Sequence, residues 1–517
     1  MLRVAIILAA MTTLCLAQSP GETVGSTQME MQEHGSGTNR IAVASDGGIY
    51  VCWMKSASFP FPRYVYWNYR TPEGNWWGEM PVSESNFAGY GCIDVGPDDC
   101  AYIFYHVADQ GIIHVASSCV PYEDFSLPDI NSLWPKAAIA ADGRFHVISA
   151  RSQYDPMVIM YNTSTDFGET WPPWVRMDSL NTNLWSINSS SISERTAIVE
   201  GVLGEDWQFD IGYIISEDGI NWDISDWHLI TDYQDSGISA QADVDLIFDN
   251  DDYLHVIWNT WEIQEPFVNS STLWHWSEET GEISQIANFD HVTCESGAWN
   301  LALCKMSLGV DADDNLYCIW TGFASDDYSA GGYCNGDLYM SYSMDGGLTW
   351  SGYEGVTNSP TPGCVPGECD SDNWATLAEK VGEYLHIFYV NDKDAGAIPF
   401  EEGAVTDNPV LYLEVPNPAR TGIDGKETLP ENLLLFSNYP NPFNARTTIK
   451  FSLAEAANVK LQIFDIAGRL VETLADCEFA AGENSVTWDA ADRSSGIYFA
   501  RLTAGDVKSS KKLLLLK

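Results

Sequence analysis

Residues 40–389 contain a repeated pair of short segments that constrains the fold more than any other feature. In each copy an apolar segment leads through a turn of Asp, Gly or Asn into an aromatic-rich segment, as in 40–44, 46–48 and 49–53. The other turns fall at 98–99, 142–143, 251–252, 313–315 and 382–383, with a weaker copy over 190–202. Successive copies are spaced by roughly 45 to 65 residues, the length of a four-stranded blade. The pattern predicts an all-β propeller, with seven blades favoured and six possible.

A second motif follows the outer part of several copies. Residues 164–171 read Ser-Thr-Asp-Phe-Gly-Glu-Thr-Trp, residues 343–350 read Ser-Met-Asp-Gly-Gly-Leu-Thr-Trp, and 216–222 form a shorter copy. The carboxylate can accept hydrogen bonds from the turn's own amides, Gly takes a positive φ, and Trp covers the hairpin. We therefore expect structural turn roles for Ser164, Asp166, Gly168, Trp171, Ser216, Asp218, Trp222, Ser343, Asp345, Gly347 and Trp350.

These motifs resemble the Asp-box (BNR) repeat of sialidase-like β-propellers. The resemblance implies that the boxes lie on the face opposite the active site. It also implies that a sialidase would need three arginines, a Tyr/Glu nucleophile pair and an Asp acid/base. The three-arginine arrangement draws on late blades as well as early ones, yet the chain has no arginine between Arg195 and Arg420. The sequence therefore disfavours sialidase activity.

Charge divides the chain into two parts. The 517 residues include 73 acidic and 25 basic ones, for a net charge of -48. Residues 428–517 hold ten of each sign, so the whole surplus belongs to residues 1–427. Such a surplus repels phosphate-rich partners and sialylated ligands, which excludes nucleic acid. The asymmetry predicts two domains with different roles.

The N-terminus has the pattern of a secretory signal peptide. Arg3 precedes an apolar run, and cleavage is expected after Ala17, so the signal peptide is 1–17. No other stretch approaches about 18 uninterrupted apolar residues, so no transmembrane span is expected. Exported proteins can hold disulfides, and 11 cysteines remain once Cys15 is removed, which leaves at least one unpaired. Close pairs that could form bridges, with the connectivity left open, are Cys364 with Cys369, Cys92 with Cys100 and Cys294 with Cys304.

The neutral segment 428–517 alternates polar and apolar residues in short runs, which predicts a small immunoglobulin-like β-sandwich after the acidic propeller at 18–427. Its motifs at 438–444, 465–469 and 495–499 resemble the type A C-terminal sorting domain of type IX secretion cargo. The resemblance implies Sec export and then passage through the outer membrane to the cell surface or medium, with the type IX machinery as partner. An ordinary adhesive module is the alternative.

Long loops opposite the boxes carry the candidate site residues, because binding sites usually lie on loops held by a rigid scaffold. These loops span 259–271, 321–336, 357–374 and 390–408. Paired carboxylates can perform acid and base work on a glycan, and the weak catalytic candidates are Glu262, Glu265, Asp326 and Asp327. Aromatic faces beside carboxylates suit sugars, and the ligand-binding candidates are Trp261, Tyr328, Asp370, Asp372 and Trp374.

Two acidic turns, 249–252 and 311–315, offer oxygen ligands but lack the twelve-residue calcium-loop pattern. We read them as hairpin turns and leave calcium open, with no metal or other cofactor assured. The sequence as a whole predicts an exported propeller that binds an extracellular ligand, a glycan or a protein, with a glycan favoured. A glycoside hydrolase acting on a non-sialylated glycan and a purely structural or adhesive surface protein are the alternatives.

Overall fold

The computed structural model contains strands and one short 3-10 helix, η2 (Ile398–Phe400), among the residues it describes. It describes residues 19–515 except 34–37, 60, 84, 120–123, 128–131, 152–157, 178–183, 205–207, 264–269, 291, 421–433, 440–442, 454–456, 466–468, 480–481, 492 and 505–506. The chain divides into two compact units, Met1–Thr421 and Gly422–Lys517. The predicted signal peptide lies outside the described residues.

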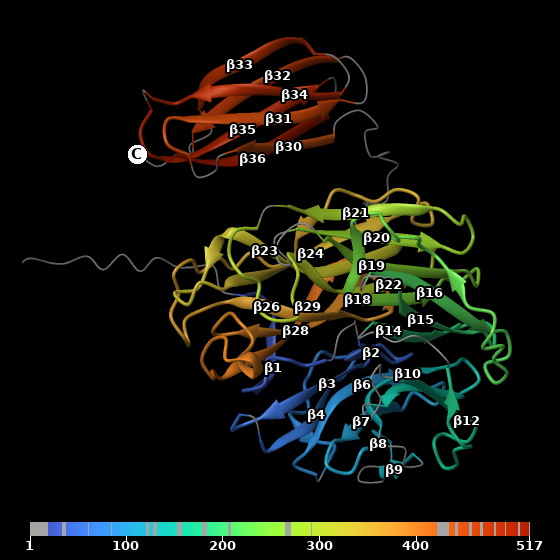
Figure 1. Ribbon diagram of the computed structural model, residues 1–517. Helices are drawn as coiled ribbons and strands as arrows, with labels where there is room; N and C mark the ends of the chain where they lie inside the picture. The colour runs from blue at the N-terminus through green and yellow to red at the C-terminus, as the bar shows by residue number, and fades with distance from the viewer. Residues whose placement is uncertain are drawn as a thin grey trace, which may run out of the picture. The chain divides into compact units, whose positions relative to one another are not determined.

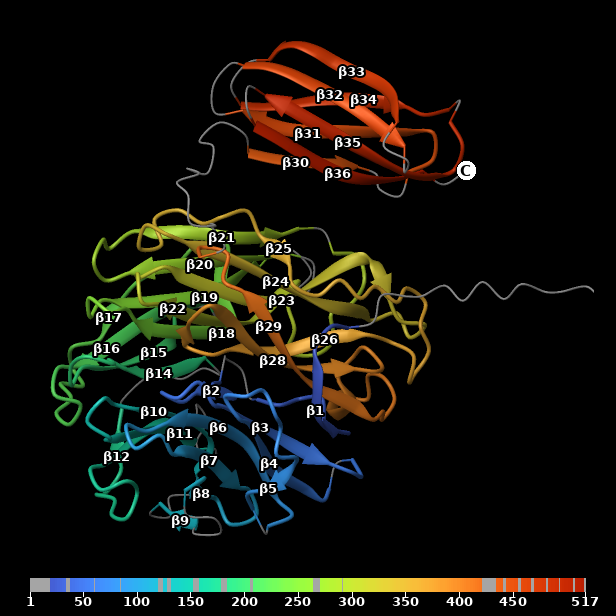
Figure 2. The ribbon, with the colours of Figure 1, turned by 180° about the vertical axis from the view of Figure 1, so that it is seen from behind.

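Seven sheets make up the first unit (Figures 1 and 2). Blade 1 consists of β2 (Ile41–Val43), β3 (Ile49–Ser56), β4 (Arg63–Arg70) and β5 (Met80–Pro81). Blade 2 consists of β6 (Ala88–Val95), β7 (Ala101–Val107), β8 (Ile112–Ser117) and β9 (Asp124–Ser126). Blade 3 consists of β10 (Ser132–Ile139), β11 (Phe145–Arg151), β12 (Val158–Ser164) and β13 (Val175–Arg176). Blade 4 consists of β14 (Trp185–Ser189), β15 (Thr196–Leu203), β16 (Phe209–Ser216) and β17 (His228–Leu229). Blade 5 consists of β18 (Ile238–Phe248), β19 (Leu254–Glu262), β20 (Ser271–Ser277) and β21 (Ile283–Phe289). Blade 6 consists of β22 (Leu303–Asp311), β23 (Leu316–Tyr328), β24 (Cys334–Ser343), β25 (Glu354–Gly355) and β27 (Lys380–Val381). Blade 7 consists of β26 (Ser371–Leu377), β28 (Tyr384–Asp392), β29 (Asn408–Pro416) and β1 (Glu22–Thr27).

The ring closes through its N-terminal strand. β1 pairs antiparallel with β29, so the first strand of the chain becomes the outermost strand of the last blade. The first strand of each blade packs beside the next, and β2 and β3 of blade 1 contact β28 and β1 of blade 7. Apolar clusters between neighbouring blades, such as the one built around Trp258, exclude water from these contacts. The predicted seven-bladed propeller is confirmed.

The repeated segments recognised in the sequence are the first two strands of each blade. Their acidic turns are held by their own carboxylates: Asp311 accepts hydrogen bonds from the amides of Asp313 (2.9 Å) and Asn315 (3.1 Å). Asp249 accepts in the same way from Asp251 and Tyr253. No group of three or more His, Cys, Asp or Glu among the described residues is arranged to hold a metal ion.

The Ser-x-Asp turns follow the third strands of their blades. Asp166 Oδ1 accepts hydrogen bonds from Ser164 Oγ (2.8 Å) and Thr170 N (2.9 Å), while Gly168 N donates to Ser164 Oγ (2.9 Å). Ser343, Asp345, Gly347 and Thr349 repeat these contacts, and Asp218 accepts from the amides of Ile220 and Asn221. The bonds lower the pKa of Asp166 and of Asp218.

Three disulfides tie the propeller loops, and only one was among the expected pairs. Cys364 is bonded to Cys369. The expected Cys92–Cys100 bridge is wrong, because Cys92 lies within β6 opposite Phe104 whereas Cys100 is beside the hairpin turn; Cys100 bonds Cys119 instead.

The expected Cys294–Cys304 bridge is also wrong. Cys304 is buried in β22 as a free thiol, and Cys294 bonds Cys334 at the start of β24.

The second unit is a two-sheet sandwich with its own core. One sheet has the order β30 (Leu434–Tyr439), β31 (Arg446–Leu453) and β34 (Gly482–Asp489). The other has the order β33 (Leu470–Phe479), β32 (Ala457–Asp465), β35 (Gly496–Ala504) and β36 (Val507–Leu515). Trp488 is fully buried between the sheets, packed against Phe443 and Tyr498. The predicted small sandwich is confirmed.

Candidate functional site

The first strands of five blades carry a bulge at corresponding places. Their pairing with the second strand shifts register between Gly89 and Cys92, Leu133 and Lys136, Ala240 and Val244, Cys304 and Ser307, and Asn373 and Thr376. Four residues at these bulges have positive φ: Tyr90 (55°), Trp134 (57°), Lys305 (53°) and Trp374 (58°). A bulge redirects side chains, and such strained backbone concentrates at functional sites.

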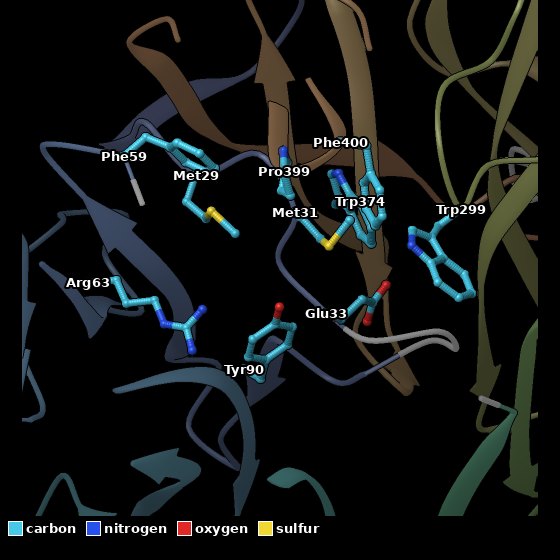
Figure 3. A pocket seen from close by; sticks show the side chains of 10 residues that line it. All are labelled: Met29, Met31, Glu33, Phe59, Arg63, Tyr90, Trp299, Trp374, Pro399 and Phe400. Atoms are coloured by element: carbon cyan, nitrogen blue, oxygen red, sulfur yellow. The ribbon is translucent and has the colours of Figure 1, made fainter. Parts of the chain in front are cut away.

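A cavity of about 300 Å³ lies where two of these bulges meet the loops. It is lined by Met29, Met31, Glu33, Phe59, Arg63, Tyr90, Trp299, Trp374, Pro399 and Phe400 (Figure 3). Arg63 begins the third strand of blade 1, Tyr90 lies in the first half of β6, and Trp374 lies at the middle of β26. The Ser-x-Asp turns follow the opposite ends of third strands, so the cavity opens on the face away from them.

Arg63 and Tyr90 are polar residues of the cavity wall, and His106, which is not part of the lining, contacts both. The Arg63 guanidinium lies 5.4 Å from the centre of the Tyr90 ring, and its Nη2 is 3.5 Å from His106 Nε2. His106 Nδ1 accepts a hydrogen bond from the backbone N–H of Trp134 (3.0 Å), which fixes the imidazole. Burial raises the pKa of Tyr90, and Arg63 partly opposes this shift. Arg63 and Tyr90 present a guanidinium and a protonated phenol to a ligand.

Glu33 is the acidic group of the cavity wall. Its side chain is 3% exposed and, among the described residues, neither carboxylate oxygen has a hydrogen-bond partner. Burial raises the pKa of Glu33, while the positive charges of Arg40, Lys136 and Lys305 lower it. The carboxylate therefore has electrostatic support from three cations but no donor bonded to it.

Buried cations also hold two of the cavity's aromatic residues. Lys305 Nζ lies 4.7 Å from the Trp374 ring centre, donates to the carbonyl oxygen of Trp299 (2.9 Å) and pairs with Asp243 at 3.4 Å. Arg40 donates through Nη2 to the carbonyl oxygen of Trp374. These contacts fix Trp299 and Trp374 before any ligand arrives, which lowers the entropic cost of binding.

Of the nine candidate residues named from sequence, the structure places Trp374 in the cavity wall. Trp261 packs against the apolar cluster around Phe323. Glu262 is exposed at the end of β19, and Glu265 lies outside the described residues.

Asp326 and Asp327 are in β23, not in a long loop. Asp327 is bonded to Asn335 Nδ2 (2.8 Å) and Thr361 N (3.0 Å), and burial raises its pKa to about 6. Tyr328 ends the same strand and is 46% exposed.

Asp370 and Asp372 are held by protein partners outside the cavity lining. Asp370 pairs with Lys393 at 2.5 Å. Asp372 accepts hydrogen bonds from Asn391 Nδ2 (2.8 Å) and Ser359 Oγ (2.9 Å). Glu33, Arg63, Tyr90, Trp299 and Phe400 also line the cavity, and none of them was a candidate from sequence.

Comparison with known proteins identifies the C-terminal unit. Residues 437–516 match the family described as secretion system C-terminal sorting domain, which confirms the predicted type IX sorting domain and indicates a secreted or cell-surface protein. No helix of the described residues is long and apolar enough to cross a membrane. No curated protein matches the chain in sequence.

Solved structures of similar fold include enzymes that act on glycans. An ulvan lyase bound to -[GlcA(1-4)Rha3S]- is 12% identical, with 76% of this chain and 96% of that chain covered and a TM-score of 0.46. An oligogalacturonate lyase in complex with manganese is 12% identical, with coverages of 78% and 99% and a TM-score of 0.43. An α-L-arabinofuranosidase from Fusarium graminearum is 11% identical, with coverages of 77% and 98% and a TM-score of 0.39. At these identities the likeness is one of fold.

Proposed function

We propose that the propeller binds an extracellular glycan in the cavity described above. The observation that carries this proposal is the lining itself: five aromatic side chains surround a space of about 300 Å³ in which two charged side chains, Glu33 and Arg63, are placed among the described residues. Ligand pockets typically combine apolar walls with a few placed polar groups. The aromatic faces suit the C–H faces of sugar rings, and the charged groups suit their hydroxyls and acidic substituents.

The carboxylates that line the cavity favour binding of a glycan over its hydrolysis. Glycoside hydrolysis with two carboxylates needs a pair about 5 to 10 Å apart across the scissile bond. Among the described lining residues Glu33 is the one carboxylate, and Glu262 and Asp327 lie outside the lining. The wall therefore supports recognition of a sugar, and the paired acids that a hydrolase requires are not supplied by the described part of it.

The proposed function also includes the route by which the protein leaves the cell. The sorting domain matched over residues 437–516 supports delivery by type IX secretion. We infer that a Sec signal peptide at 1–17 starts this route and that passage through the outer membrane ends it, so that the cavity meets extracellular glycans.

The test is a glycan array of neutral, carboxylated and sulfated oligosaccharides, probed with the purified full chain and followed by calorimetry on the strongest binder. Trp299→Ala should weaken binding by tenfold or more, since it removes a stacking face. Trp77→Ala is the matched control, because Trp77 is 64% exposed and packs on Tyr69 outside the cavity. Absence of binding to every glycan, or equal effects of the two substitutions, would contradict the proposed function.

A further inference from the structure

Glu33 differs in its hydrogen bonding from three other acids of the propeller, Asp243, Asp245 and Asp94. Asp243 accepts from the backbone N–H of Lys305 (3.1 Å), Asp245 from that of Leu308 (2.9 Å), and Asp94 from that of Ile139 (2.7 Å). Each of these carboxylates is satisfied by protein donors. Glu33 is as buried as Asp243 and Asp245, but both of its oxygens lack a partner among the described residues.

An unpartnered buried carboxylate is costly, and native proteins rarely retain one without a reason. Here the side chain lines a cavity, so its oxygens are within reach of a bound molecule. Figure 3 shows the Glu33 carboxylate turned toward Trp374 and Trp299, between these rings and Tyr90. The missing donors are therefore expected from the ligand.

The surroundings of Glu33 define the chemistry of those donors. Arg40, Lys136 and Lys305 already supply positive charge on the protein side. Asp243, paired with Lys305 at 3.4 Å, offsets part of this positive charge. The cations still weaken the attraction of Glu33 for an ammonium group, and an anionic group would be repelled by the Glu33 carboxylate. A hydroxyl is neutral and donates a hydrogen bond, and two adjacent hydroxyls can donate to the two oxygens of one carboxylate.

We propose that Glu33 is the specificity-determining residue of the cavity and that it binds adjacent hydroxyl groups of a neutral sugar ring packed against Trp299 and Trp374. This inference rests on the proposed glycan-binding function. It goes further by naming the class of ring that enters the cavity and the residue that selects it.

The first test uses the neutral oligosaccharide that binds most tightly on the array, together with analogues that lack one hydroxyl. Glu33→Gln keeps the size of the side chain but replaces one acceptor oxygen with an amide. We expect at least tenfold weaker binding of the parent sugar and a smaller penalty for the critical deoxy analogue in the variant than in the wild type. Glu354→Gln, an exposed acid of β25, is the control and should change neither value. Unchanged binding by Glu33→Gln, or binding of carboxylated and sulfated glycans alone, would overturn the proposal.

The second test needs no ligand. An acid kept for a ligand costs the free protein stability, so the melting temperature of Glu33→Gln should equal or exceed that of the wild type, with Glu354→Gln unchanged. A lower melting temperature would mean that Glu33 is a structural partner of the buried cations, and would overturn its role in recognition. If no glycan binds but Glu33→Gln is stabilised, the glycan function and the sugar class fail together, whereas the assignment of Glu33 as an acceptor that awaits a ligand stands.

Discussion

The carboxylate of Glu379 accepts a hydrogen bond of 2.8 Å from the side-chain amide of Asn188, three blades away in the ring of seven. The same oxygen also accepts a hydrogen bond from the side-chain amide of Asn39, just before blade 1. Glu379 follows the first strand of blade 7, so one half-buried acid connects blades 7, 1 and 4 across the middle of the propeller. Burial and the negative charge of Asp94 raise the pKa of Glu379.

Two substitutions of Glu379 should therefore separate the contribution of its acceptor oxygen to stability from the contribution of its charge. Glu379→Ala removes this acceptor from the half-buried amide of Asn39 and the buried amide of Asn188, and we expect the free energy of unfolding to fall by about 2 to 3 kcal/mol. Glu379→Gln keeps an acceptor oxygen and should change the free energy of unfolding by less than about 1 kcal/mol. Denaturant unfolding of both variants measures the difference, and equal losses would show that the charge, not the acceptor, matters.

Buried acids also predict how stability changes with pH. Burial raises the pKa of Asp245 to about 7 and that of Asp372 to about 7. Between about pH 4 and pH 7 the folded state therefore binds protons that the unfolded chain releases, so the free energy of unfolding falls as pH rises through this window. Each group contributes at most about 1.4 kcal/mol per pH unit.

The acids of the Ser-x-Asp turns act in the opposite direction. Hydrogen bonds lower the pKa of Asp166 and Asp218, so their contribution is present above their unfolded pKa and is lost at lower pH. Denaturant midpoints should accordingly be highest near pH 4 and lower at pH 7. Asp245→Asn should flatten the decline from pH 4 to pH 7, and a variant whose decline is as steep as that of the wild type would contradict this assignment.

Gly347 tests how closely the Ser-x-Asp turn at 343–350 packs on its neighbour. It has φ of 83°, and a Cβ placed on it would lie 1.9 Å from Cε1 of His275. Gly346, one residue earlier, has φ of 68° but its nearest contact would be 3.8 Å away. Gly346→Ala should cost about 1 kcal/mol of unfolding free energy for the backbone strain, and Gly347→Ala about 3 kcal/mol or more because a steric clash is added. Equal costs in thermal unfolding would show that the turn shifts to relieve the contact.

The number of blades could be predicted because most copies of the repeat carry a local signal. An Asp or Gly turn between two apolar segments, as at 142–143 or 251–252, specifies a hairpin without reference to the rest of the chain. The closing strand β1 carries no such turn and pairs with β29, almost 400 residues later. Pairings of this kind follow from the closed ring and not from a local pattern.

The cavity could not be predicted for a related reason. Glu33 and Trp299 lie in connections between blades, outside the repeated segments, and Arg63 begins a third strand that the repeat pattern did not cover. The bulges at Tyr90 and Trp374 have positive φ without glycine, so no residue type marks them. Trp374, which lines the cavity, was a candidate from sequence because an aromatic residue beside acids in an inter-blade stretch is a chemical signal, whereas the assembly of the other wall residues depends on ring closure.

Export of the protein and recognition of its ligand should depend on different units of the chain. The sandwich buries Trp488 in a core of its own, and among the described residues the propeller's apolar clusters contain none beyond Thr421, so we expect the two units to fold independently. A chain ending at Thr421 should keep the wild-type melting transition of the propeller and its glycan affinity in vitro. In the producing cell it should accumulate in the periplasm, because the sorting domain over 437–516 is gone. Fractionation and calorimetry measure the two outcomes, and a truncated chain that still reaches the medium or loses its ligand would contradict this division of roles.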